Sequence, residues 1–422
     1  MLSRSRSPVT AIAGMLGRCT RRLYHPAPAL LSVPHPPASA FPRTIPAAPL
    51  RTPTPNHPLL ILGIETSCDD TSVSLVSSDR RVRSLVTANQ NKLHEPMGGV
   101  VPTNAAIAHS MNLPSTLRGA LDQAGLHTPA DLAQIDAVAV TRGPGLAPCL
   151  GVGLCAAKNL AGMLNKPLIG VHHMEAHALT PRLTEHSPPQ FPYLSLLVSG
   201  GHTMLILTRG LGSHQILGST LDDAVGEAFD KTARALGLKW LNTGGGAGAA
   251  LERAALAATG QHKVRFSVPL RDGRDKPERR MCFSFSGLKT AVQRHVDALP
   301  AGMVDTEAVK ADVAFAFQTA AVAHLEDRLR RALGVLVTEQ KVPVTAVVVA
   351  GGVAANKYLA SRLGKVVENE FGLPLMVPPA KLCTDNAAMI AWVGVERYLA
   401  GKVDAWETDY VPKWPLSELT EE

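Results

Sequence analysis

Two apolar segments far apart in the chain share one pattern. LLILGIE begins at Leu59 and is followed by turn residues 66–70 and a second apolar run, SVSLV. The pattern recurs from Pro192, where PYLSLLV leads into the turn SGGH at residues 199–202 and then into TMLILT. Short apolar runs separated by turn residues are typical of β-hairpins. The chain therefore predicts two strand–turn–strand units that arise from an internal duplication.

Helices and single strands follow each hairpin. After the first one, the pattern predicts a helix after Ala106, a strand at residues 137–141, an Ala- and Gly-rich helix from about Gly151 and a strand at residues 168–171. Later, VTAVVVA runs into a glycine pair at residues 351–352 and then into the helix-prone VAANKYLASRL. This order predicts an α/β fold, and such a glycine turn can admit a nucleotide close to the backbone.

Composition indicates a globular chain without a membrane span. Of the 422 residues, 45% are hydrophobic and 18% are charged, which is enough to build one or two sizeable cores. The longest apolar stretch, residues 145–157, ends at Lys158 and is shorter than the roughly 18 to 20 residues that a spanning helix needs. Six scattered cysteines without a CxxC pair favour a reducing compartment. We therefore expect no contact with a membrane.

The positive charge is concentrated at the amino terminus. Residues 1–58 contain no Asp or Glu, and their seven arginines account for the whole formal charge of +7. This composition is typical of a mitochondrial presequence followed by a proline-rich linker that should not pack, and it predicts a location in the mitochondrial matrix. A disordered basic tail is the alternative. The arginines are Arg4, Arg6, Arg18, Arg21, Arg22, Arg43 and Arg51.

Nine motifs are distributed between Leu59 and Tyr398. They are GIETSCDDT at residues 63–71, GGVVP at 98–102, GPGLAPCLGVGLCAAKNLA at 143–161, HHMEAH at 172–177, LVSGGHT at 197–203, DDAVGEAFDK at 222–231, FSFSGLKT at 283–290, AGGVAAN at 350–356 and CTDNAAMIAW at 383–392. In this order they resemble the tRNA threonylcarbamoyladenosine transferase family. The resemblance implies an α/β, two-lobed fold of the actin, sugar kinase and Hsp70 class of ATPases, with duplicated hairpin-led units and a cleft between the lobes.

The resemblance also implies an activity. Family members transfer the threonylcarbamoyl group from threonylcarbamoyl-AMP to N6 of the adenosine 3′ of the anticodon, position 37, in tRNAs that read codons beginning with adenine, and AMP is released. A separate synthase would supply the donor, the mitochondrial tRNAs would be the acceptors, and a homodimer stays open as the assembly. The alternatives are another ATP-dependent enzyme of this fold, a metallopeptidase, or an Hsp70-like module, for which too few residues follow Tyr398.

Two histidines form a candidate metal site. His173 and His177 are four residues apart, so on a helix they would lie on one face and could bind one cation, although such a pair can equally be two polar neighbours. The resemblance implies Asp385 as the third ligand of one divalent ion, zinc or iron, with coordination positions open to substrate. Glu175 lies two places after His173, unlike the glutamate of H-E-x-x-H peptidases, and should point away from this face.

The second hairpin turn suits an anion. Ser199, Gly200 and Gly201 leave backbone amides unobstructed, although an ordinary Gly-Gly hairpin has the same appearance. The resemblance implies that these three residues, with Leu197 and Val198, contact the adenylate. It further implies that Asp230, Gly248 and Glu252 frame the ribose and base and that Asn356 closes the adenine pocket, with Gly246 as an alternative to Gly248.

Two acidic residues occupy the first hairpin turn. Asp69 and Asp70 could be ordinary solvated turn residues, because aspartate is common in turns. The resemblance implies that one of them, with Asp69 favoured, orients or deprotonates the adenine amine. The stretch at residues 271–280 is rich in arginine and is either a solvated loop or an RNA contact.

These elements predict four parts of the chain. We expect a presequence and linker at residues 1–57, a first lobe at 58–185, a second lobe at 190–411 that includes a helical insertion and the C-terminal helix, and a tail at 412–422.

Overall fold

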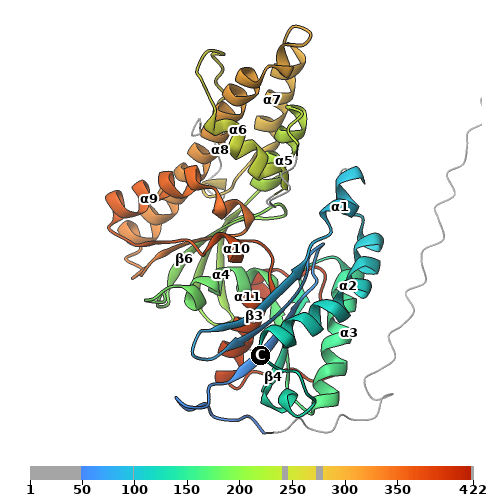
Figure 1. Cartoon of the computed structure of the whole chain (residues 1–422). Coiled ribbons are helices and arrows are strands. Elements are labelled where there is room, and N and C mark those ends of the chain that lie inside the picture. The colour runs from blue at the N-terminus through green and yellow to red at the C-terminus, as the bar shows by residue number, and fades with distance from the viewer. Residues whose placement is uncertain (1–48, 98, 240–245, 272–278, 420–422) are drawn as a thin grey trace, which may run out of the picture. The chain divides into compact units, whose positions relative to one another are not determined.

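Two five-stranded sheets form the framework of the computed structural model, which describes residues 49–97, 99–239, 246–271 and 279–419 (Figure 1). The strand order is β3-β2-β1-β4-β5 in the first sheet and β10-β9-β6-β7-β8 in the second. The first sheet contains β1 (Leu60–Glu65), β2 (Thr71–Ser77), β3 (Val82–Ala88), β4 (Ala137–Gly143) and β5 (Leu168–His172). The second contains β6 (Tyr193–Val198), β7 (Thr203–Gly210), β8 (Ser213–Ser219), β9 (Val347–Ala350) and β10 (Leu375–Met376).

The two sheets have the same topology. β1 pairs antiparallel with β2 and parallel with β4, so that Gly63 lies opposite both Ser74 and Ala139. β6 repeats this arrangement with β7 and β9, and Leu196 lies opposite Leu205 and Val349. The structure therefore confirms the duplicated hairpin-led units and the two-lobed α/β fold.

Helices cover the two sheets. α2 (Pro102–Gln123) and α3 (Ala147–Leu164) pack on one face of the first sheet, and α4 (His173–Thr184) and α11 (Ala387–Leu399) pack on the other. The apolar core of the second lobe includes α5 (Val225–Ala235), α6 (Gly246–Leu256), α7 (Ser286–Asp297), α8 (Glu307–Leu333) and α9 (Lys357–Phe371). The short helices are α1 (Asn91–His94), α10 (Ala380–Cys383) and 3₁₀ or π turns, among them η6 (Gly334–Glu339), η7 (Gly352–Ala355) and η8 (Leu416–Glu418).

The C-terminal helix packs in the first lobe, so the expectation that it belongs to the second lobe is wrong. The reason is a close contact between α11 and β1. A β-carbon added at Gly63 would lie 2.5 Å from the Ala387 carbonyl oxygen and 2.7 Å from the Ala391 amide nitrogen. Only a glycine permits this approach, which holds the start of α11 beside the end of β1.

The expected tail at residues 412–422 is also packed as far as the structure describes it. Leu416 and Leu419 are buried against the face of the second sheet opposite α5 to α9. The carbonyl oxygen of Trp414 accepts a hydrogen bond from Nε2 of His172, at 3.0 Å. The C-terminal segment therefore contacts the residue directly before the candidate metal ligand His173.

One described helix, α3, has a length and composition that would allow it to cross a membrane. In the structure α3 packs against α2 and β4, and its buried residues belong to an apolar core of the first lobe. One such helix is weak evidence for a membrane span, because core helices of globular proteins can have the same length and composition.

The segment directly before β1 makes specific contacts, and our expectation that the linker does not pack is wrong for residues 51–57. Arg51 donates from Nε and Nη2 to the Asp136 carboxylate, at 2.8 and 2.7 Å, and its Nη1 donates to the His57 carbonyl oxygen. Its backbone amide donates to the hydroxyl of Tyr398 on α11. This bidentate pair raises the pKa of Arg51.

Deleting residues 1–48 should leave the thermal midpoint of the protein unchanged, whereas deleting residues 1–57 should lower the free energy of unfolding by about 1 kcal/mol. The loss is small because Arg51 is 40% exposed, and Arg51→Ala in the full chain should reproduce most of it. Arg83→Ala, at an exposed arginine, is the matched control. Equal midpoints for Arg51→Ala and Arg83→Ala would show that the contact does not stabilise the fold.

Candidate functional site

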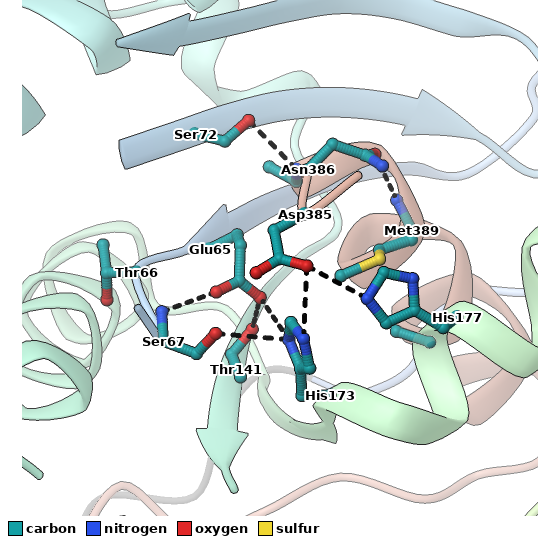
Figure 2. A network of polar contacts seen from close by, with 12 residues as sticks. Glu65, Thr66, Ser67, Ser72, Thr141, His173, His177, Asp385, Asn386 and Met389 are labelled. Atoms are coloured by element: carbon teal, nitrogen blue, oxygen red, sulfur yellow. Dashed lines mark hydrogen bonds and ion pairs between the residues drawn. The ribbon is translucent and has the colours of Figure 1, made fainter. Parts of the chain in front are cut away.

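Three side chains from two distant segments converge at the start of α4 (Figure 2). His173 is the first residue of α4, His177 lies one turn later, and Asp385 precedes α11. Oδ1 of Asp385 lies 3.4 Å from Nε2 of His173 and 3.1 Å from Nε2 of His177. Their candidate ligand atoms all lie within 4.8 Å of one another. The structure thus brings together the three residues that the sequence suggested as metal ligands.

The position of α4 is fixed by the residue before it. Nδ1 of His172 accepts a hydrogen bond from the Met174 amide at 3.1 Å, and Nε2 donates to the Trp414 carbonyl oxygen. Both bonds require the neutral ring with its proton on Nε2, and burial lowers the pKa of His172 to about 3. His172 therefore acts as a permanently neutral cap of the helix that carries both histidine ligands.

Asp385 is positioned by the start of α11. The side chain of Asn386 accepts from the Met389 amide at 3.1 Å and caps the helix. The next amide, of Ala387, donates to Oγ of Ser72 on β2, at 3.0 Å. The first bond joins the turn that carries Asp385 to α11, and the second joins it to the first sheet.

Glu65 belongs to the same cluster, although we did not assign it a role from the sequence. It is the last residue of β1 and is 1% exposed, and its Oε2 lies 3.1 Å from Nδ1 of His173. The Ser67 amide and the Thr141 hydroxyl donate to the same carboxylate (Figure 2). Glu65 therefore orients His173 so that Nε2 faces Asp385, as carboxylates commonly do behind a histidine ligand. The available signal was a single carboxylate at the end of a buried apolar strand.

The electrostatics of this cluster favour a bound cation. Burial alone raises the pKa of Asp385, but the nearby His173 and His177 hold it well below its usual value. Burial lowers the pKa of His173, but Asp385 and Glu65 raise it well above the usual value. A proton on His173 thus supplies the positive charge between two carboxylates. A divalent ion could replace that proton, and two imidazoles with one carboxylate are a suitable donor set for zinc or iron.

Glu175 points away from the histidine face, as the spacing predicted. Its Oε1 accepts hydrogen bonds from the Gly212 amide at 2.7 Å and from Nε2 of His214 at 2.9 Å. Burial raises the pKa of Glu175, but the bonds from His214 and Gly212 leave it below its usual value. This carboxylate ties α4 to the β7–β8 hairpin, and it is not placed to activate a metal-bound water.

The first hairpin turn is attached to α2. Nε2 of His109 donates to the Cys68 carbonyl oxygen at 3.0 Å, while Nδ1 accepts from the Thr71 hydroxyl at 2.8 Å. The two carboxylates of this turn, Asp69 and Asp70, are partly buried. Burial, together with the nearby charges of Asp69, Asp385 and Glu65, raises the pKa of Asp70 to about 7. A carboxyl group with this pKa can accept a proton near neutral pH.

The second hairpin turn has open space around its glycines. The Ser199 amide donates to the His202 carbonyl oxygen at 2.8 Å, and the His202 amide donates to Oγ of Ser199 at 3.0 Å. A β-carbon at Gly200 or Gly201 would meet no heavy atom within 4 Å apart from the adjoining residues. Neither glycine has a positive φ angle, so neither packing nor backbone conformation requires a glycine there. Close approach of a ligand gives a reason for both.

Leu197 and Val198 lead into this turn with buried side chains, 1% and 0% exposed. Any contact that they make with an adenylate must therefore come from their backbone. The N-terminus of α5 packs against the turn, because a β-carbon at Gly226 would lie 2.6 Å from the Ser199 carbonyl oxygen. The Val225 amide donates to the Thr203 hydroxyl at 2.8 Å, so α5 and the turn form one unit.

The other residues expected at the donor site lie on α5, on α6 and directly before α9. Asp230 on α5 accepts a hydrogen bond from the Gly248 amide, and burial raises its pKa. Oε1 of Glu252 on α6 accepts from the Lys357 amide at 2.8 Å, beside Asn356. Asn356 caps α9 by accepting from the Leu359 amide at 2.9 Å. The structure thus places Gly248, rather than Gly246, against Asp230.

The expected RNA contact cannot be described as a whole, because residues 272–278 lie outside the described part of the chain. Of its flanking residues, Arg271 is exposed, and the Arg280 carbonyl oxygen accepts a hydrogen bond from Nη1 of Arg328.

Comparisons with known proteins identify relatives of this chain. The family model described as tRNA N6-adenosine threonylcarbamoyltransferase, TsaD, matches residues 81–392. A protein of Arabidopsis thaliana named "Probable tRNA N6-adenosine threonylcarbamoyltransferase, mitochondrial" is 44% identical over 378 residues, which is 85% of this chain and 75% of that protein. The Sphingopyxis alaskensis protein named tRNA N6-adenosine threonylcarbamoyltransferase is 47% identical over 363 residues, 86% of this chain and 97% of its own.

Solved structures include more distant matches. The crystal structure of HypF from T. kodakarensis is 14% identical, with a TM-score of 0.47 over 84% of this chain and 49% of that chain. The family assignment rests on the sequence relatives and on the model match, which agree with each other and cover most of the described fold. This chain belongs to the tRNA N6-adenosine threonylcarbamoyltransferase family.

Proposed function

We propose that this protein transfers the threonylcarbamoyl group from threonylcarbamoyl-AMP to N6 of adenosine 37 in mitochondrial tRNAs that read codons beginning with adenine, and that AMP is released. Family membership supports the reaction. The observation that carries the proposal is the convergence of His173, His177 and Asp385 in a chain that also has an open glycine turn.

The donor would bind in the second lobe. The amides of Gly200 and Gly201, free of side chains, suit the phosphate of the adenylate, and the Ser199 hydroxyl adds a polar group. Asp230 with Gly248, and Glu252 with Asn356, would then frame the ribose and the base. We propose these contacts because the same helix, α5, both packs against the turn and carries Asp230.

The acceptor amine would react beside the first hairpin turn. As the bond between N6 and the carbamoyl carbon forms, the bond from that carbon to the phosphate oxygen breaks, and N6 loses a proton. Asp70 is suited to take this proton because its pKa is about 7, and Asp69 would orient the amine. The metal ion, when bound by His173, His177 and Asp385, would stabilise negative charge on the carbonyl oxygen.

The alternatives fit less well. A metallopeptidase would need an acidic residue near the metal-bound water, and Glu175 is bonded to His214 and Gly212 instead. A small-molecule kinase of the same fold would not require the His173–His177–Asp385 set. The transferase is therefore the function that this site supports best.

We also propose the cellular setting and the division of the chain. The mitochondrial name of the Arabidopsis relative and the acid-free amino terminus support a presequence and a location in the matrix. A separate synthase would supply threonylcarbamoyl-AMP. A homodimer is the assembly that we consider for this chain. The first lobe would comprise residues 58–185 together with α11, and the second lobe would comprise the residues from 190 up to α11.

Removing a proposed metal ligand should release the ion. His173→Ala, His177→Ala and Asp385→Ala should each lose bound metal and transferase activity while remaining folded, because each supplies one of three ligands. Glu65→Gln should weaken metal binding by about 10- to 100-fold, since it changes only the partner of His173. Metal content by elemental analysis, read beside the transfer rate, tests this.

His186→Ala, at an exposed histidine, is the control for these variants. Glu175→Ala should keep its metal but melt at a lower temperature, because it leaves buried His214 without its partner. Full metal content and a full transfer rate in the histidine variants would contradict the assignment of these residues as metal ligands.

Filling the open space at the glycine turn should prevent donor binding. Gly200→Val should raise the Kd for a non-hydrolysable threonylcarbamoyl-adenylate at least tenfold, about 1.4 kcal/mol, because the side chain would occupy the path of the phosphate. Calorimetry and the thermal midpoint are measured together. Gly162→Val on α3, where a β-carbon also meets nothing within 4 Å, should bind normally. Equal donor affinity in the two folded variants would rule out the phosphate role of the turn.

The transfer rate should depend on the protonation of Asp70. Its carboxyl group must be deprotonated to act as a base, so the rate should rise with pH and level off above an inflection. The pKa of Asp70 places that inflection near 7, and a bound cation, which offsets the charges of Asp385 and Glu65, moves it lower. Asp70→Asn should reduce kcat by about 100-fold and remove this inflection. An unchanged pH profile in Asp70→Asn would contradict the role of Asp70 as the base.

A further inference from the structure

A long groove lies on the second lobe outside the site described above. Its volume is about 1310 Å³, and it is lined by α6, α8, α9 and the segment 257–271 that follows α6. This exceeds the roughly 300 to 1000 Å³ of pockets that bind small molecules. Its lining includes Glu252 of the proposed adenosine pocket and Lys357, whose backbone amide donates to Glu252.

The acidic side chains of the groove are already engaged. Asp312 accepts hydrogen bonds from the backbone amides of Thr259, Gly260 and His262, at 2.7, 2.7 and 2.8 Å. Glu326 pairs with Arg362 at 2.7 Å, and Asp327 pairs with Arg331 at 2.9 Å. Asp312 in particular fixes the segment that forms one wall.

Four basic side chains of the groove are not engaged in this way. Lys263, Arg265, Arg271 and Lys357 are exposed, and none of them forms an ion pair within the described ranges. Lys263 and Arg265 lie directly after the segment 259–262, whose amides donate to Asp312. The groove therefore presents positive charge from a wall that is fixed before any ligand binds.

Aromatic side chains also line the groove. Phe315 on α8 is 43% exposed, and the centroid of its ring lies 6.0 Å from that of Tyr358 at an interplanar angle of 69°. The guanidinium of Arg362 lies over the Tyr358 ring, 5.7 Å from its centroid. Unpaired bases stack on such rings, while the flanking cations contact phosphates.

We propose that this groove binds a single-stranded segment of the substrate tRNA outside the reacting adenosine. The proposal rests on the proposed function, because it takes the acceptor to be tRNA. A double-stranded segment would offer Phe315 no free base to stack on, since the bases of a double helix are already stacked on one another. The RNA strand would place phosphates at Lys263 and Arg265 and at least one base against Phe315.

Equilibrium binding of an unmodified tRNA transcript to the full chain tests the groove. The double variant Lys263→Glu, Arg265→Glu should raise the Kd at least tenfold and make the slope of log K against log salt shallower by about 1.4, which corresponds to two lost phosphate contacts on a single strand. Phe315→Ala should also raise the Kd but leave the salt slope unchanged. In steady-state assays, both should raise KM for tRNA and leave KM for threonylcarbamoyl-AMP as it was.

Arg83→Glu, a charge reversal at an exposed arginine in the first lobe, is the matched control and should bind tRNA normally. Normal binding and an unchanged salt slope in the folded double variant would overturn the proposal. An increase in KM for threonylcarbamoyl-AMP without an increase in KM for tRNA would also overturn it. If the double variant melts early, Arg271→Glu and Phe315→Ala carry the same test. Failure of the unaltered protein to bind or modify tRNA would instead contradict the proposed function.

Discussion

Two carboxylates beside the same buried histidine, Glu65 fully buried and Asp385 30% exposed, are the constraint on which the site depends. Glu65 and Asp385 lie on opposite sides of His173, and a buried carboxylate is stable only when positive charge or hydrogen bonds compensate for its lost hydration. Meeting this requirement brings three parts of the chain together: the end of β1, the start of α4 and the turn before α11. The close approach at Gly63 and the caps formed by His172 and Asn386 hold those parts in place.

Helix α4 connects the two duplicated units. α4 carries both histidine ligands on the first lobe, contacts β6 and β9 of the second sheet, and is bonded through Glu175 to the β7–β8 hairpin. A displacement of the second sheet relative to the first would therefore disturb α4 directly. The ligand set is consequently sensitive to the arrangement of both sheets.

Sequence patterns predicted local features well and distant ones poorly. Both hairpins and the strands at residues 137–141 and 168–171 were predictable because each apolar run has its own turn signals. The common face of His173 and His177 followed from helical periodicity. Asp385 is 208 residues from His177, so its place in the set came only from the family resemblance.

The corrected features share one cause, since each depends on a contact between segments far apart in the chain. We expected α11 in the second lobe because it follows that lobe in the sequence. Its close backbone contact with Gly63 instead places it in the first lobe. Composition suggested that the linker does not pack, but one arginine, Arg51, anchors it to Asp136 and Tyr398. Glu65 was overlooked because nothing local shows that a carboxylate at a strand end faces a histidine more than a hundred residues away.

The duplicated topology also bears on how the chain evolved. The two hairpins have the same topology but turns of different charge: the first turn holds Asp69 and Asp70, the second Gly200 and Gly201. An ancestor made of two identical halves would have carried the same turn twice, and so would have favoured either cationic or anionic groups at both. In a single chain, each turn can differ from its counterpart. Two unequal halves would thus let the proposed acceptor amine lie beside the acidic turn and the proposed phosphate beside the glycine turn, which exact symmetry would not allow.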